Sequence, residues 1–188
     1  MARIGALALQ GGYDAHLKSI ARLGHEGVRV RTPDELEGLD GLILPGGEST
    51  THLKLIDRFQ LWQPLDDFAR SGKPVLATCA GLILAAQVVS HPTQRSFGWL
   101  QVEVSRNAWG RQVHSFEATP DKAAPGLEDL PLVFIRAPRI EALGPDTEAL
   151  VFTRGEVVMV RQGNVFGAAF HPELTPDLRV HRLVFGEG

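Results

Sequence analysis

The sequence predicts an α/β fold of three layers, in which a mostly parallel sheet carries helices on both faces and a small antiparallel insertion. Short apolar segments alternate with segments whose apolar residues recur at helical spacing. Three of the apolar segments end at turns that contain glycine, at 10–12, 45–47 and 79–81. Short apolar strands that alternate with helices imply a parallel sheet covered on both faces.

The first half of the chain repeats the pattern of strand, turn and helix. We expect strands at residues 3–9, 28–30, 42–44 and 75–78. We expect helices at residues 13–23, through 53–56, at 61–70 and at 82–89. The Gly-Lys-Pro sequence at residues 72–74 separates the third helix from the strand that follows it.

The second half of the chain begins with a segment of different composition and then returns to strand-like segments. Between residues 90 and 131, short alternating pieces at 102–105 and 113–118 stand among Pro, Gly and Asn, which predicts an antiparallel insertion or edge hairpin. Further strands are expected at residues 132–135, 149–153, 157–161 and 165–170, and a closing helix at 177–185. The chain shows no repeat, linker or low-complexity segment, so we expect residues 1–188 to form one domain.

Composition excludes several classes of protein. The chain has 188 residues, 44% hydrophobic and 22% charged, which is typical of one globular domain and not of disordered or fibrous proteins. A net charge of −3 provides no basic field, so we expect no nucleic-acid partner and no membrane binding. We see no signal-peptide pattern and no long apolar span, and the single cysteine allows no internal disulfide. A cytoplasmic location is therefore expected.

The first candidate for chemistry is Cys79, at the point where an apolar strand must turn sharply into a helix. Small residues around it, including Ala80 and Gly81, allow a tight turn that would lift the sulfur above the carboxyl edge of the sheet. The start of the helix offers N–H groups that favour a thiolate, which is the attacking form of cysteine. Alternatively, Cys79 is a small buried apolar residue, as many free cysteines are.

The second candidate is the pair His171 and Glu173, which follows a strand of apolar and small residues. In an extended segment, residues two apart share a face. A cysteine nucleophile needs a base, and the base needs a third group to fix its tautomer, so these two residues can fill both roles. The other histidines lack such a neighbour in sequence and are interpreted as structural or surface residues: His16, His25, His52, His91, His114 and His181.

The third candidate is the sequence Pro-Gly-Gly-Glu-Ser-Thr at residues 45–50, directly after a buried strand. Its glycines can turn N–H groups toward a bound oxygen, forming an oxyanion hole with the N–H of Ala80. A tight turn followed by a helix cap is the simpler alternative. A phosphate loop is less well supported because the required lysine spacing is absent after Gly47. A metal site lacks a third ligand beside His171 and Glu173.

Together these motifs resemble the class I glutamine amidotransferases with their Cys-His-Glu triad. The resemblance is most specific to the glutaminase subunits of pyridoxal 5'-phosphate synthase. This narrower resemblance rests on blocks spread in order over almost the whole chain, at residues 7–11, 45–50, 105–108, 134–138 and 170–174. One departure from the broader pattern is Ala77, where a glycine usually opens the turn before the nucleophile.

The resemblance implies a function and a site. It implies hydrolysis of L-glutamine to glutamate and ammonia through a thioester on Cys79, with His171 as base and then acid and Glu173 orienting it. It implies no cofactor and no metal. The ammonia would pass to a synthase subunit, and activity would depend on docking to that partner. The implied oxyanion hole is Gly47 and Ala80, and the implied glutamine-binding residues are Gly46, Gly47, Glu48, Arg106, Ile135 and Arg136.

Two other functions remain open on the sequence. One is a glutamine-binding or partner-binding module whose cysteine does no chemistry, against which the intact Cys79, His171 and Glu173 argue. The other is the group of hydrolases and stress proteins with a cysteine at a similar turn, which lacks both the Pro-Gly-Gly-Glu block and the His-Pro-Glu sequence.

Overall fold

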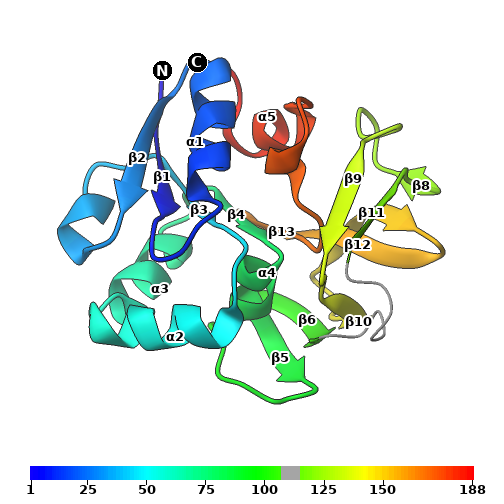
Figure 1. Cartoon of the computed structure of the whole chain (residues 1–188), viewed down its shortest axis with the longest axis horizontal. Helices are drawn as coiled ribbons and strands as arrows, with labels where there is room; N and C mark the ends of the chain where they lie inside the picture. The colour runs from blue at the N-terminus through cyan, green and yellow to red at the C-terminus, as the bar shows by residue number, and fades with distance from the viewer. Residues whose placement is uncertain (107–114) are drawn as a thin grey trace.

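The protein is built on an eight-stranded sheet, seen in Figure 1 as the band across the middle of the molecule. The structure is a computed structural model that describes residues 1–106 and 115–188. In spatial order the strands are β2 (Glu26–Val30), β1 (Arg3–Leu7), β3 (Gly41–Leu44), β4 (Val75–Thr78), β13 (Val165–Ala168), β12 (Glu156–Gln162), β11 (Glu148–Thr153) and β8 (Lys122–Ala123). The pairings from β2 to β13 are parallel, and those from β13 to β8 are antiparallel.

Helices cover both faces of the parallel half of this sheet, as predicted. In Figure 1, α1 (Tyr13–Arg22) and α5 (Arg179–Phe185) lie on one face. On the other face lie α2 (Ser49–Arg58), α3 (Trp62–Arg70) and α4 (Ala80–Ala85). Two short 3-10 helices, η1 (Pro33–Leu36) and η2 (Pro172–Leu174), complete the described helices. The three-layer α/β fold expected from the alternating apolar segments is confirmed.

The core lies where the central strands are covered twice. Every residue of β3, β4 and β13 is buried, which is why these segments are almost uninterrupted runs of apolar and small residues. The amphipathic helices turn their apolar sides inward, with Ile20 of α1, Ile56 of α2 and Leu65 of α3 fully buried.

The register of the central strands places three strand ends next to one another. Leu44 of β3 is paired with Ala77 of β4, and Thr78 of β4 is paired with Ala168 of β13. The segments that follow these residues therefore leave the sheet at one edge. This is the edge at which open parallel sheets bind ligands.

One predicted element is wrong in its second half. The helix expected at residues 82–89 ends at Ala85, and β5 (Ala86–Ser90) continues in its place. Periodicity could not separate the two, because a short apolar run fits a buried helix and a strand equally well. The run ends in Val88 and Val89, whose branched side chains favour a strand, and Val88 is 49% exposed.

The insertion differs in detail from the expected antiparallel piece. β6 (Leu100–Ser105) pairs in parallel with β5 and antiparallel with β10 (Arg139–Leu143), a strand that the sequence analysis missed. β7 (Ser115–Ala118) pairs antiparallel with β9 (Leu132–Ile135) in a separate two-stranded sheet. Residues 113 and 114 of the expected strand lie outside the described residues. The closing helix starts at Arg179, whose backbone N–H donates to the Asp177 carboxylate.

Candidate active site

Cys79 lies in the sharp turn between β4 and α4 that the sequence predicted. Its backbone has φ 49° and ψ −105°, a conformation that costs free energy in any residue with a side chain. The backbone N–H of Cys79 donates to the carbonyl of Ala168 at 2.8 Å, which anchors the turn to β13. Gly81 is required beside it, because a Cβ there would lie 2.0 Å from the carbonyl oxygen of Leu44. The turn therefore holds the sulfur above the sheet edge.

His171 and Glu173 form the pair that their spacing predicted. The Nδ1 of His171 lies 2.7 Å from the Oε1 of Glu173, and both residues are buried. The backbone N–H of His171 donates to the carbonyl of Val133 in β9, which fixes where the chain leaves β13. Because an ionised carboxylate only accepts hydrogen bonds, Nδ1 carries the proton and Nε2 is left for the cysteine.

The electrostatics of the triad favour a charged imidazole. Burial lowers the pKa of His171, but interactions with the nearby Cys79 and with Glu173 outweigh burial and raise the pKa to about 10. Burial also opposes ionisation of Glu173, yet the neighbouring histidines bring the pKa of that carboxyl below its usual value. Near pH 7 His171 can therefore hold a proton, and the carboxylate supports the resulting imidazolium.

The glycine loop after β3 lies directly against the triad. A Cβ on Gly46 would meet the Cε1 of His171 at 2.6 Å, so only glycine fits there, and Gly47 has φ 136°. The carbonyl of Gly46 lies 3.1 Å from the Nε2 of the buried His52. On the other side, the Gln10 amide pairs with both backbone groups of Glu48, at 2.9 and 3.2 Å.

The Glu48 side chain has a second role that the sequence did not predict. It caps α2 by accepting from the backbone N–H groups of Thr50 and Thr51, and it contacts Arg106 at 3.2 Å. Burial works against ionisation of Glu48, but the hydrogen bonds from Thr50 and Thr51 prevail and lower its pKa to about 2. The carboxylate is therefore ionised throughout the neutral range.

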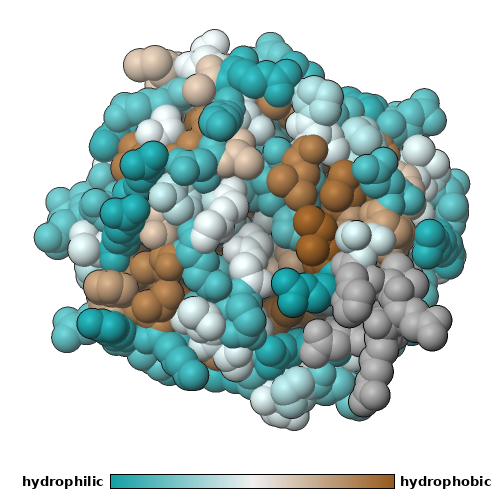
Figure 2. All heavy atoms as spheres, viewed as in Figure 1, coloured by the Kyte–Doolittle hydropathy of each residue, from teal (hydrophilic) through white to brown (hydrophobic). Residues whose placement is uncertain are grey.

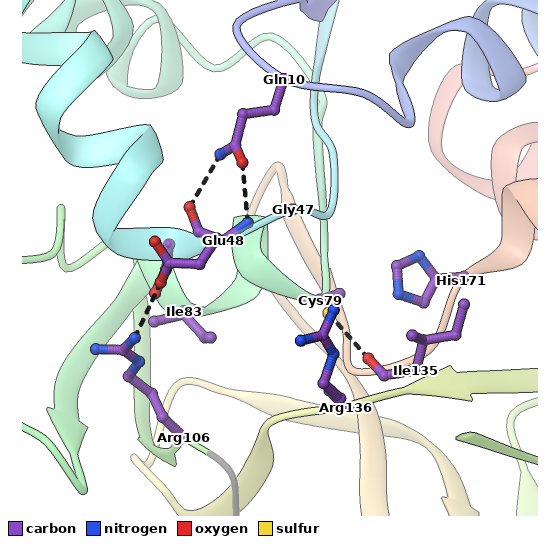
Figure 3. Close-up of a pocket in the computed structure, with 10 residues that line it drawn as sticks. Gln10, Gly47, Glu48, Cys79, Ile83, Arg106, Ile135, Arg136 and His171 are labelled. Carbon is purple, nitrogen blue, oxygen red and sulfur yellow. Dashed lines mark hydrogen bonds and ion pairs between the residues drawn. The ribbon is translucent and has the colours of Figure 1, made fainter. Parts of the chain in front are cut away.

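Most of the predicted site residues meet in one pocket of about 400 Å³, shown in Figure 3. A volume of this size suits a small polar ligand. The lining residues are Gln10, Gly47, Glu48, Ser49, Cys79, Ile83, Arg106, Ile135, Arg136 and His171. Gly46 adjoins this lining, Ala80 follows Cys79 at the start of α4, and Glu173 lies behind His171. Residues 107 and 108, the second half of one resemblance block, lie outside the described residues.

Sequence reasoning missed part of the site. Gln10 had a signal, because it opens the glycine-rich turn that follows β1, near the ends of the other central strands. His16 and His52, which the sequence analysis interpreted as structural or surface residues, are both buried, and both contact the candidate site. His16 lies 3.3 Å from Glu173, and His52 contacts the carbonyl of Gly46. No local pattern could reveal this, because their partners are distant in sequence.

The remaining histidines have different surroundings. His181 is fully buried beside His16. His25 forms hydrogen bonds with the backbone of Ala2 and of Gly186, near the two ends of the chain. His91 is exposed, and His114 lies outside the described residues. Within the two described segments, no group of three His, Cys, Asp or Glu side chains could hold a metal ion, and no helix is long and apolar enough to cross a membrane.

Comparisons with known proteins agree with this geometry. Residues 6–187 match the SNO glutamine amidotransferase family. The chain is 50% identical over 184 residues to a Bacillus licheniformis protein and 49% identical over 179 residues to one from Moorella thermoacetica, both named pyridoxal 5'-phosphate synthase subunit PdxT. The alignments cover 97% and 95% of this chain and 93% and 95% of those proteins.

Solved structures of other proteins show the same fold. A crystal structure of a glutamine amidotransferase superposes with a TM-score of 0.90 at 43% identity, covering 96% of each chain. A putative GMP synthase subunit from Thermoplasma acidophilum shares the fold at a TM-score of 0.71 and 17% identity, covering 99% of this chain and 93% of that one. With the predicted triad and pocket in place, this chain belongs to the SNO glutamine amidotransferase family.

Proposed function

We propose that this chain is a glutaminase that hydrolyses L-glutamine to L-glutamate and ammonia for a pyridoxal 5'-phosphate synthase. The observation that carries the proposal is the position of Cys79 in a strained turn, beside a buried imidazole that a carboxylate holds at 2.7 Å. We further propose that residues 1–188 act as one glutaminase domain. The reduced state that a cysteine nucleophile requires supports a cytoplasmic location.

The pocket suits the free end of an amino acid. Arg136 lines it, and no hydrogen bond or ion pair of its guanidinium is found among the described residues. A guanidinium binds a carboxylate through paired hydrogen bonds, so Arg136 takes the α-carboxylate of glutamine, with Arg106 nearby. Glu48 supplies an ionised oxygen for the α-ammonium group. The pocket thus offers both charges that complement a zwitterion, and the side-chain amide is directed toward Cys79.

The reaction proceeds in two halves. The Cys79 sulfur attacks the amide carbon of glutamine while His171 holds the thiol proton, and the backbone N–H groups of Gly47 and Ala80 stabilise the oxyanion. His171 gives its proton to the amide nitrogen, the C–N bond breaks, and ammonia leaves a thioester. Water then attacks the thioester, His171 takes a proton from the water and returns it to the sulfur, and glutamate is released.

The surface beside the pocket supports a protein partner. Figure 2 shows apolar side chains gathered where Figure 1 places β9 and the segment before α5. Two exposed apolar residues come from these elements, Ile135 at 38% and Leu174 at 50% exposure. Apolar surface next to an active site is typical of a protein interface. A synthase subunit docked there would receive ammonia before water protonates it.

Glutamate release by the purified chain tests the activity, measured alone and with a synthase subunit. We expect partner-dependent turnover that Cys79→Ala abolishes without lowering Tm. A folded protein with no turnover beside a competent synthase would favour the binding module instead. Glu173→Ala distinguishes a glutaminase from the related cysteine hydrolases and stress proteins. Unchanged turnover in this variant would show that Glu173 has no part in catalysis and would favour that other group.

Gel filtration with the synthase subunit tests the docking. Leu174→Arg should reduce co-elution, whereas Phe59→Arg, at a 40% exposed apolar position at the end of α2, should not. Separate elution of the wild-type proteins under turnover conditions would refute the docking.

A further inference from the structure

A second layer of buried polar side chains lies behind the triad. The Oε2 of Glu173, the oxygen that does not face His171, lies 3.3 Å from the Nε2 of His16 in α1. The Nδ1 of His16 lies 2.9 Å from the Nε2 of His181 in α5. The His16 and Glu173 side chains are 0% and 2% exposed, and His181 is also fully buried. Three separate segments of the chain therefore bring a line of polar atoms to the back of the carboxylate.

The hydrogen-bonding capacity of these groups fixes where the protons lie. The Nε2 of His16 forms a hydrogen bond with the Thr78 hydroxyl at 3.2 Å. It also lies 3.3 Å from the Oε2 of Glu173, a buried oxygen that has no hydrogen-bond partner among the described residues. Because a carboxylate can only accept, the His16 nitrogen that faces it carries the proton. The other nitrogen of His16 then accepts, and His181 donates to it from Nε2. The reverse assignment would place a lone pair of His16 against the carboxylate. It would also bury an unpaired N–H on His181, whose Nδ1 has no hydrogen-bond partner among the described residues.

Both histidines must be neutral for this arrangement to help the triad. A charged His16 would compete with His171 for the carboxylate and repel the imidazolium. Burial lowers the pKa of His16 and of His181, the latter to about 3, so both are neutral near pH 7. The groups that face His16 are Glu173, His181 and Thr78, with His171 beyond the carboxylate. Neutral His16 thus supplies a donor without a competing charge.

We propose that His16 and His181 are positioning residues, which hold the rear oxygen of Glu173 and thereby fix the orientation of His171 toward Cys79. This inference rests on the proposed glutaminase function. Neither histidine touches the substrate or the reacting atoms. Their effect passes through the carboxylate, in the way that outer hydrogen bonds orient the ligands of other active sites.

The test compares three variants in complex with the synthase subunit. His16→Leu removes the donor, whereas the amide nitrogen of Gln in His16→Gln occupies the place of Nε2 and keeps it. Ser19→Ala, a buried position on the same helix, is the matched control. We expect His16→Leu to lower kcat about 10-fold or more with KM within about 2-fold, and His16→Gln to restore most of it.

The pH profile separates positioning from mere packing. Without the donor, the Glu173 carboxylate is less stable, so the acid limb of kcat/KM should move to higher pH in His16→Leu and return in His16→Gln. Lower activity with an unchanged profile in both variants would show a structural role only and overturn the proposal. An inactive wild-type complex would instead refute the glutaminase function, so the two failures are distinguishable.

A measurement on the wild-type protein does not depend on whether the variants fold. Nitrogen-15 NMR of the histidine side chains at pH 7 should find His16 and His181 neutral, each with its proton on Nε2. A protonated His16, or a proton on its Nδ1, would overturn the proposal.

Discussion

Replacing Gly46 by alanine tests how closely the glycine loop is fitted to the triad. The added methyl group would lie 2.6 Å from the Cε1 of His171 and 3.3 Å from its Nδ1. Carbon atoms in contact normally stay about 3.5–4.0 Å apart, so the imidazole must move by about 1 Å. The main chain at Gly46 lies outside the left-handed region, so alanine causes no backbone strain of its own. The perturbation is therefore concentrated on His171.

A displacement of that size is costly for catalysis and mild for folding. The imidazole would leave its 2.7 Å hydrogen bond to Glu173 and lose its alignment with Cys79. A misplacement of about 1 Å can reduce turnover about 10²-fold, which corresponds to about 2.7 kcal/mol in the activation barrier. A thermal melt should show little change, because glycine to alanine at an unstrained position also restricts the unfolded chain.

Glutamate release by the complex with the synthase subunit measures this effect, with Gly11→Ala as the matched control. Gly11 stands in the loop after β1, where a Cβ would meet nothing within 4 Å, so its substitution should leave kcat unchanged. Turnover of Gly46→Ala within about 3-fold of the wild type, at an unchanged Tm, would refute the reasoning, since the imidazole would then not depend on the space that glycine provides.

Three further results are expected. Gly81→Ala should lower Tm by roughly 6–12 °C, because its Cβ would lie 2.0 Å from the Leu44 carbonyl and overpacking against backbone costs about 3 kcal/mol; an unchanged melt would contradict this. Ionised Glu48 contributes stability that is present above pH 4.5 and is lost as the pH falls toward about 2, so urea titrations of Glu48→Gln should lack that loss. The pKa of His181 is about 3 in the folded protein and 6.5 in the unfolded chain. The free energy of unfolding should therefore decrease as the pH falls below 6.5, by on the order of 2 kcal/mol at pH 5. In His181→Gln this decrease should be smaller by the same amount.

The sequence could predict those parts of the fold that depend on local chemistry. The strands at the centre of the sheet are runs of apolar residues bounded by glycine or proline, so their positions followed directly. It could not separate β5 from the end of α4, because partners outside the segment decide between helix and strand for a short apolar run. β10 was missed for a related reason, since its pairing with β6 includes an irregular register and its sequence mixes charged and apolar residues.

The candidate site divides in the same way. Cys79, His171 and the glycine loop were predictable because each stands at a strand end, where the sequence itself marks a sharp turn. His16 and His52 were not, because each is a single polar residue inside an amphipathic helix. Each contacts the site only through groups that packing brings close. His16 and Glu173, for example, are 157 positions apart in the sequence. A periodic pattern carries no information about such a partner.

The two halves of the site are held by different kinds of contact, and this difference explains how a partner could control the reaction. Buried groups hold the triad, since His171 and Glu173 are each 8% exposed and their contacts are shielded from water. At the glycine loop, the contacts of Gln10 and of the Glu48 side chain lie at the exposed mouth of the pocket, where competing water makes each of them weak. A subunit that covers this mouth can therefore shift the glycine loop, where we propose the oxyanion hole, with a small change in free energy, while the Cys79, His171 and Glu173 side chains behind it keep their contacts.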